Sequence, residues 1–89
     1  MANVWIPTTI RELTNGQQQV RVDGNTIREI IDNLDFLFPG IKNKLCNNGQ
    51  MLPGIAIIVD GVSGGMGMLE QVMENSEVHF LPAIGGGMT

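Results

Sequence analysis

Residues 26–38, Thr-Ile-Arg-Glu-Ile-Ile-Asp-Asn-Leu-Asp-Phe-Leu-Phe, decide the fold. Their apolar side chains recur every three or four residues and form one stripe, which consists of Ile27, Ile30, Ile31, Leu34, Leu37 and Phe38. This period predicts an amphipathic α-helix with one face in a core. Thr26 followed by Glu29 is a capping box, in which two side chains satisfy free amide groups at a helix start. Pro39-Gly40 predicts the end of the helix.

Segments with the period of β-strands lie on both sides of this helix. Residues 3–6 and 20–22 predict two strands ahead of it, and residues 77–81 predict a strand near the end of the chain. The continuous apolar run at residues 55–59 predicts the central strand of the sheet. The side chains expected to face the helix are Val4, Ile6, Val20, Val22, Ile55, Ile57, Val59, Val78 and Phe80. Strands that bury alternate residues against one helix indicate an α+β domain.

The size and charge of the chain limit the functions it can have. Its 89 residues make one small domain. Nine acidic against five basic side chains give a net charge of −4, the wrong sign for a protein that binds nucleic acid through its phosphates. The single cysteine cannot form an internal disulfide, and residues 1–11 carry neither a secretion leader nor a membrane span. We therefore expect a cytoplasmic protein that binds neither nucleic acid nor membrane.

The residue types that carry catalysis or metal binding do not combine into a site in this sequence. The glycines at 61–67 lack the Lys-Ser/Thr that completes a phosphate-binding loop, so we interpret this segment as a connection. His79 and Cys46 have no partner ligands at metal-binding spacing, and no nucleophile has a histidine base beside it. We therefore expect no enzyme activity, no metal site and no bound cofactor.

The C-terminal glycines are the most informative feature of the chain end. Gly85, Gly86 and Gly87 follow closely on the last predicted strand. Glycines at a terminus often form nothing more than a frayed tail. However, a strand that leads into a tail without side chains can also deliver a terminal carboxylate into a narrow active site of another protein, because glycine lets the backbone approach closely. We divide the chain into a folded domain, residues 1–84, and a flexible tail, residues 85–89.

Several short motifs occur together in the order and spacing of a known family. They are Ile6-Pro7-Thr8-Thr9-Ile10-Arg11, Thr14-Asn15-Gly16, Val22-Asp23-Gly24-Asn25-Thr26-Ile27, Pro39-Gly40-Ile41 and Leu81-Pro82-Ala83-Ile84-Gly85-Gly86-Gly87. With them, almost the whole chain resembles the ThiS/MoaD family of sulfur-carrier proteins, and it is most similar to the branch that serves cysteine biosynthesis. The resemblance implies a ubiquitin-like β-grasp fold, in which a mixed sheet of four to five strands carries one main helix on one face.

The resemblance also implies a carrier that receives sulfur at its last glycine. An E1-like adenylating enzyme would consume ATP to activate the Gly87 carboxylate, which is then converted to a thiocarboxylate. The sulfur would pass to a sulfur-accepting synthase, such as a cysteine-synthase-like enzyme, for cysteine or a sulfur-containing cofactor. Gly85, Gly86 and Gly87 would enter the partner's active site. Because Met88 and Thr89 follow Gly87, we expect a JAMM-type metalloprotease to remove them first.

A docking face follows from the same fold. The side of a β-grasp sheet that faces away from the helix is uncovered, and strand alternation places Trp5, Ile58, His79 and Leu81 on it. Exposed tryptophan is enriched at the energetic centres of interfaces. We interpret these residues as a partner-docking face, unless residues 46–54 cover it.

A second function uses the same tail. In a ubiquitin-like protein modifier, the terminal glycine forms an isopeptide bond with a lysine of another protein, and a β-grasp interaction module uses no tail chemistry at all. The sequence leaves these alternatives open, because both ubiquitin-like modification and sulfur transfer need an activated glycine.

Overall fold

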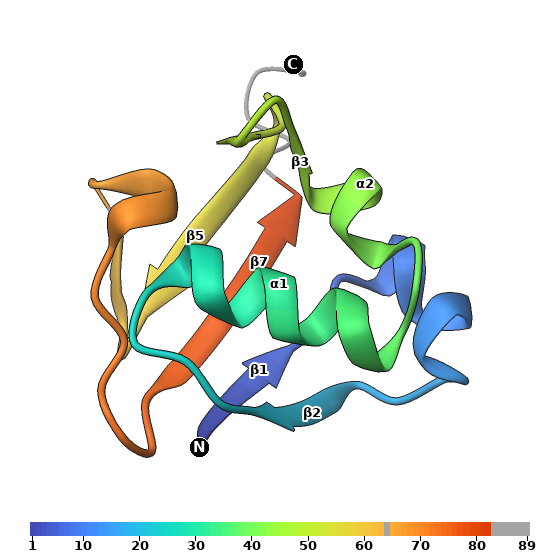
Figure 1. Cartoon of the computed structure of the whole chain (residues 1–89), viewed down its shortest axis with the longest axis horizontal. Coiled ribbons are helices and arrows are strands. Elements are labelled where there is room, and N and C mark those ends of the chain that lie inside the picture. Colours follow the sequence, from blue (N-terminus) through green and yellow to red (C-terminus); the bar gives the residue numbers. More distant parts are fainter. Residues whose placement is uncertain (64, 83–89) are drawn as a thin grey trace.

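The protein is a mixed β-sheet with one main helix across it. The computed structural model describes residues 1–63 and 65–82 (Figure 1). The strands are β1 (Ala2–Trp5), β2 (Gln19–Val22), β3 (Cys46–Asn47), β4 (Gln50–Met51), β5 (Ile55–Val59), β6 (Val62–Ser63) and β7 (Glu77–Pro82). The helices are α1 (Ile27–Leu37) and α2 (Ile41–Leu45), with 3₁₀ turns at Thr8–Thr14 and Gly67–Leu69.

The order of strands in the main sheet is β2-β1-β7-β5-β6. β1 and β7 are parallel, and the other neighbours are antiparallel. The prediction of a mixed sheet with the helix on one face is therefore confirmed (Figure 1). The prediction that residues 55–59 form the central strand is wrong, because β7 occupies the centre. Hydrophobicity records how deeply a strand is buried, whereas its place in the sheet depends on which strands it pairs with.

The start of α1 is fixed by the capping box. The Thr26 side-chain oxygen accepts a hydrogen bond from the backbone N–H of Glu29 at 3.2 Å. The Glu29 carboxylate in turn accepts the backbone N–H of Asn25 at 2.8 Å, one residue earlier than in the usual box. Gly24 precedes this cap with a φ of +154°, and a Cβ there would lie 3.0 Å from the Ile30 backbone nitrogen. The chain can therefore enter the helix this closely only because residue 24 has no side chain.

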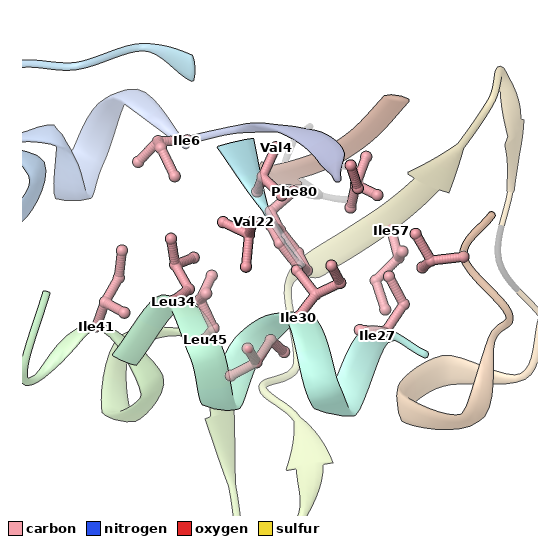
Figure 2. Close-up of a cluster of buried hydrophobic side chains, with 14 of the residues drawn as sticks. Val4, Ile6, Val22, Ile27, Ile30, Leu34, Ile41, Leu45, Ile57 and Phe80 are labelled. Carbon is pink, nitrogen blue, oxygen red and sulfur yellow. The ribbon is translucent and has the colours of Figure 1, made fainter. Parts of the chain in front are cut away.

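The core lies between α1 and one face of the sheet (Figure 2). The helix contributes Ile27, Ile30, Ile31 and Leu34, all fully buried. The sheet contributes Val4, Val20, Val22, Ile57, Val59, Val78 and Phe80, joined by Ile6 just beyond β1. Ile55 is partly buried and packs against this cluster. All the strand residues predicted to face the helix therefore lie in or against the core, which confirms the period of two in the strands. The four buried residues of α1 confirm the helical period up to Leu34.

The end of the predicted apolar stripe differs from expectation. Leu37 is 52% exposed, whereas Phe38 is partly buried against the core. At 100° per residue, Leu37 lies about 70° from the middle of the four buried helix residues, at the margin of the stripe. Ile41 and Leu45 of α2 fill the core beyond the helix end instead, and both are fully buried. A short second helix thus provides the packing that the sequence pattern assigned to the last turn of α1.

Truncation of Ile57 tests the position of the core. Ile57→Ala removes buried apolar volume between β5 and the helix, and we expect the free energy of unfolding to fall by about 2–5 kcal/mol. Phe36→Ala is the matched control, because Phe36 is 86% exposed and its loss should change stability by no more than about 0.5 kcal/mol. Chemical denaturation measures both variants. Equal effects of the two substitutions would show that β5 does not contribute to the core as described.

Candidate docking face

The face of the sheet opposite α1 carries the predicted docking residues. The register places Trp5 opposite His79 and His79 opposite Ile58, so three strands contribute to one row. Leu81 lies two residues further along β7, opposite Ala56, and is 45% exposed. The structure thus brings Trp5, His79 and Ile58 together and sets Leu81 beside them. Their role in binding a partner stays a prediction.

Trp5 and His79 form a stacked aromatic pair. Their ring centroids lie 5.1 Å apart and the ring planes differ by 8°. Both residues are half-buried, so part of each ring stays exposed on the open face. Stacking of two side chains from parallel neighbouring strands restricts both rings. A face with rings held in advance loses less conformational entropy when a partner binds.

Glu77 adjoins this pair at the start of β7. Its carboxylate accepts a hydrogen bond from the Trp5 indole Nε1–H at 2.7 Å. It also accepts bonds from the Asn3 side-chain amide at 3.2 and 3.3 Å, and the same amide donates to Gln19 at 2.8 Å. The bonds from Trp5 and then Asn3 lower the pKa of Glu77 below its usual value. The open face therefore changes from polar at Glu77 to apolar at Leu81, in the direction in which the chain leaves the sheet.

Sequence reasoning missed Glu77 and Asn3 as members of this face. The signal was available, because each lies two residues before an identified member, His79 in one strand and Trp5 in the other. Residues i and i+2 of a strand share a face. Attention to aromatic and apolar residues alone left the polar half of the face unassigned.

The Asp60 carboxylate forms hydrogen bonds that hold the start of β7 in place. One of its carboxylate oxygens accepts the backbone N–H of Glu77 at 2.8 Å, and the other accepts the hydroxyl of Ser76 at 2.8 Å. Ser76 is buried and its oxygen also accepts the backbone N–H of Met73. The Glu77 N–H and then the Ser76 hydroxyl lower the pKa of Asp60, because both bonds favour the charged form. Asp60 thereby connects the end of β5 to the first residue of the central strand.

Residues 46–54 do not cover this face. Cys46 is buried in the core cluster, and Met51 packs against the same cluster from β4. The short β3–β4 hairpin therefore contributes to the helix side of the molecule. Burial raises the pKa of the Cys46 thiol, as expected for an ordinary structural cysteine. The possibility that residues 46–54 fill the docking face is wrong.

The remaining predicted site residues are at the C-terminus. Gly85, Gly86, Gly87, Met88 and Thr89 lie outside the described residues, and their roles stay predictions. In residues 1–63 and 65–82, no group of three or more His, Cys, Asp or Glu side chains is placed to hold a metal ion. Within the same ranges no helix is long and apolar enough to cross a membrane.

The architecture and the comparisons agree on the class of protein. A mixed sheet with β1 and β7 parallel at its middle, one helix across one face and an open opposite face defines a ubiquitin-like β-grasp domain. The ThiS family model matches residues 4–87. The chain belongs to the ThiS family, which confirms the resemblance read from its motifs.

Individual relatives cover nearly the whole chain. The sulfur carrier protein CysO of Mycobacterium tuberculosis is 30% identical over 94% of this chain and 96% of its own. A crystal structure of the Amycolatopsis orientalis BexX/CysO complex contains a chain that is 30% identical, with a TM-score of 0.90, covering 98% of this chain and 100% of that one. Small archaeal modifier protein 1 of Methanosarcina acetivorans has a TM-score of 0.79 at 19% identity, covering 97% and 95%, and shares the fold.

The Asp60 contacts predict how stability depends on pH. The pKa of Asp60 is lower in the folded protein than the value of about 3.9 of a free aspartate. The charged Asp60 therefore contributes fully to the free energy of unfolding above the free value, and this contribution is lost as the pH falls through the folded pKa. Asp60→Asn removes the charge but tolerates the left-handed backbone at this position, φ 52°. We expect the variant to be less stable near neutral pH, with a gap that narrows below about pH 4. Thermal unfolding measures this gap, and a gap independent of pH would contradict the assignment.

Proposed function

We propose that this protein is a sulfur carrier whose working group is the carboxylate of Gly87. The observation that carries the proposal is the ThiS family match, which runs through residue 87, together with CysO relatives named as sulfur carriers over nearly the whole chain. The fold is consistent with this role. β7, the central strand, runs to Pro82 and leads directly into residues 83–89.

The proposed chemistry takes place in two steps at the last glycine. First, an oxygen of the free Gly87 carboxylate attacks the α-phosphorus of ATP, so that an acyl adenylate forms and pyrophosphate leaves. Second, the sulfur of a hydrosulfide ion attacks the carbonyl carbon and AMP leaves, so that the terminus becomes a thiocarboxylate. An E1-like enzyme would supply the catalytic groups, and ATP is its substrate. The carrier contributes a terminus with no side chain near the reacting carbon.

Met88 and Thr89 must be removed for this chemistry to occur. In the encoded chain the Gly87 carbonyl belongs to a peptide bond with Met88, so no carboxylate is available there. The Met88 side chain also follows immediately after the glycines, where the proposed active-site channel admits none. Cleavage of the Gly87-Met88 bond by a JAMM-type metalloprotease would convert the precursor to the working form.

The open face of the sheet would position the tail in its partners. Trp5, His79 and Ile58 form a half-buried row, and the exposed Leu81 stands next to it on the strand that leads into the tail. A partner that covers this row would therefore receive the tail in a fixed direction. The adenylating enzyme and a sulfur-accepting synthase, such as a cysteine-synthase-like enzyme, would use the face in turn. The CysO relative of Amycolatopsis orientalis, which was crystallised in complex with BexX, supports a role that involves docking to a protein partner.

Protein modification is the less supported alternative. The archaeal modifier structures share the fold at 19–20% identity, a level that bears on architecture alone. The sulfur carriers are nearer in sequence, at 28–30% identity. Lysine conjugates of the trimmed chain would be the direct evidence for this alternative.

Substitution of Ile58 tests the docking face. Ile58→Glu places a charge in the middle of the row, and we expect it to abolish binding to the E1-like enzyme from the same genome while circular dichroism stays unchanged. Leu81→Asp is a second variant at a more exposed position of the same face. Phe36→Glu, on the exposed side of α1, is the control and should bind normally. Isothermal titration calorimetry measures the affinities; equal affinities for all four proteins would remove the face from the interface.

Removal of the two last residues tests the tail. The chain that ends at Gly87, incubated with ATP, the E1-like enzyme and a sulfur donor, should gain the mass of one sulfur in exchange for one oxygen. The full-length chain should not react, because its glycine carbonyl is part of a peptide bond. Gly87→Ala in the trimmed chain should react more slowly, since a methyl group enters the channel.

Intact-protein mass spectrometry measures all three proteins in parallel. If the full-length chain is activated as readily as the trimmed one, Gly87 is not the working terminus.

A further inference from the structure

Glu77 is a charged group that the fold holds in place without neutralising it. It lies on the exposed surface of β7, and donors on two sides fix its carboxylate: the Trp5 indole and the Asn3 amide. Asn3 is held in turn by Gln19. An exposed glutamate normally keeps its rotamer freedom, and its ordering costs conformational entropy. Here that freedom is already restricted, as in groups arranged to meet a ligand.

The donors around Glu77 are all neutral. Across residues 1–63 and 65–82, the ion pairs join the N-terminus of Met1 to Glu74 and Lys42 to Asp32. Neither pair includes Glu77. A carboxylate has about four lone-pair positions, and the contacts with Trp5 and Asn3 occupy only part of them. The outward side of the Glu77 carboxylate therefore retains acceptor capacity. After the hydrogen bonds from Trp5 and Asn3, the charge of His79 lowers and that of Asp60 raises the pKa of Glu77, but no ion pair within the described residues neutralises the carboxylate.

A hollow of about 400 Å³ opens beside this carboxylate. It is lined by Met1, Asn3, Gln19, Arg21, Asn75 and Glu77. The lining residues bring two cationic groups, the N-terminus of Met1 and the Arg21 side chain, and both lower the pKa of Glu74, the N-terminus more, but not that of Glu77. The Glu77 end of the hollow is thus negative and rich in amide groups; Trp5 and His79 do not line the hollow, and Trp5 adjoins it through its hydrogen bond to Glu77.

A planar cation fits these surroundings better than a compact one. The carboxylate accepts the edge N–H of the Trp5 indole, so the ring and the anion adjoin each other. A guanidinium can donate two N–H groups to a carboxylate while its flat surface lies against an aromatic ring. An ammonium group offers neither the fork nor the flat surface. One carboxylate with neutral amides is also too few oxygen ligands for a divalent metal ion.

We propose that the polar half of the docking face binds an arginine side chain of the protein partner, with its guanidinium paired to Glu77 beside the Trp5–His79 stack. This inference rests on the proposed function, in which the same face meets the adenylating enzyme. The complementary surface of that enzyme then combines an apolar patch over Ile58 and Leu81 with one arginine at its border. The apolar half supplies contact area, and the arginine sets the direction in which β7 points its tail.

Binding by Glu77→Gln tests this inference. The substitution keeps the side-chain length and an oxygen for the Trp5 N–H but removes the charge. Calorimetry with the E1-like enzyme should show affinity about tenfold weaker or worse, and less loss of affinity with added salt than for the unaltered protein. Glu74→Gln is the matched control, because it removes the same charge from the neighbouring exposed glutamate outside the row. It should bind within about twofold of the unaltered protein.

The outcomes distinguish failure of the proposed docking face from failure of the arginine inference alone. If the unaltered protein does not bind, or Ile58→Glu binds normally, the proposed function of the face fails. If Ile58→Glu abolishes binding but Glu77→Gln matches Glu74→Gln, the docking face stands and the arginine inference is overturned.

A small probe distinguishes a guanidinium from an ammonium group. Trp5 is the single tryptophan, so its indole N–H gives one signal in a nitrogen-15 spectrum. N-acetyl-arginine amide should move this signal more than N-acetyl-lysine amide at equal concentration, and Glu77→Gln should lose the difference. Equal shifts from the two probes, no shift from either, or a difference that persists in Glu77→Gln would overturn the inference.

Discussion

The structure depends on the packing of the Ile27–Leu34 stripe of α1 against a single face of the sheet. The four buried helix residues and the buried strand residues form one hydrophobic cluster, so loss of this contact would leave the sheet without its main packing partner. Because the helix covers only one face, the other face stays open. The same packing buries Val78 and Phe80 of β7, and the pairing of β7 with β1 and β5 places it at the centre of the sheet. The open face of the sheet and the burial of β7, the strand that precedes residues 83–89, are thus consequences of one packing arrangement.

In the proposed mechanism, recognition and chemistry occupy different parts of the chain. The face around Trp5 and His79 would supply affinity, and its side chains are already ordered by stacking and by hydrogen bonds to Glu77. Asp60 holds the first residue of β7 through the Glu77 amide, so the strand that carries the tail is fastened at its beginning. The reacting carboxylate can then belong to a glycine, because the partners recognise the sheet face and need no side chain at the reacting residue.

Patterns within short segments of the sequence predicted those elements of the fold that depend on interactions between residues near one another in the chain. The capping box at Thr26 and the helical stripe set α1, and strand alternation named the sheet side of the core and the open row. Pairing between distant segments could not be predicted in the same way: the central place of β7 depends on partners more than fifty residues away, since Asn3 is opposite Glu77. Glu77 was missed for a similar reason, because its role depends on donors from β1. The packing of Ile41 and Leu45 in place of Leu37 also depends on how α2 folds back onto the core.

The central claim is that Gly87 is the sulfur-bearing terminus, and the mass of the protein as cells make it tests this claim most directly. Intact-mass spectrometry of the protein purified from its own organism, under conditions that preserve thiocarboxylates, should find a chain that ends at Gly87. A fraction of these molecules should carry one sulfur in place of one oxygen, and reaction with a thiol-selective reagent should mark that fraction at the terminus. Molecules that all end at Thr89, or a trimmed chain found only in isopeptide linkage to lysines, would contradict the account.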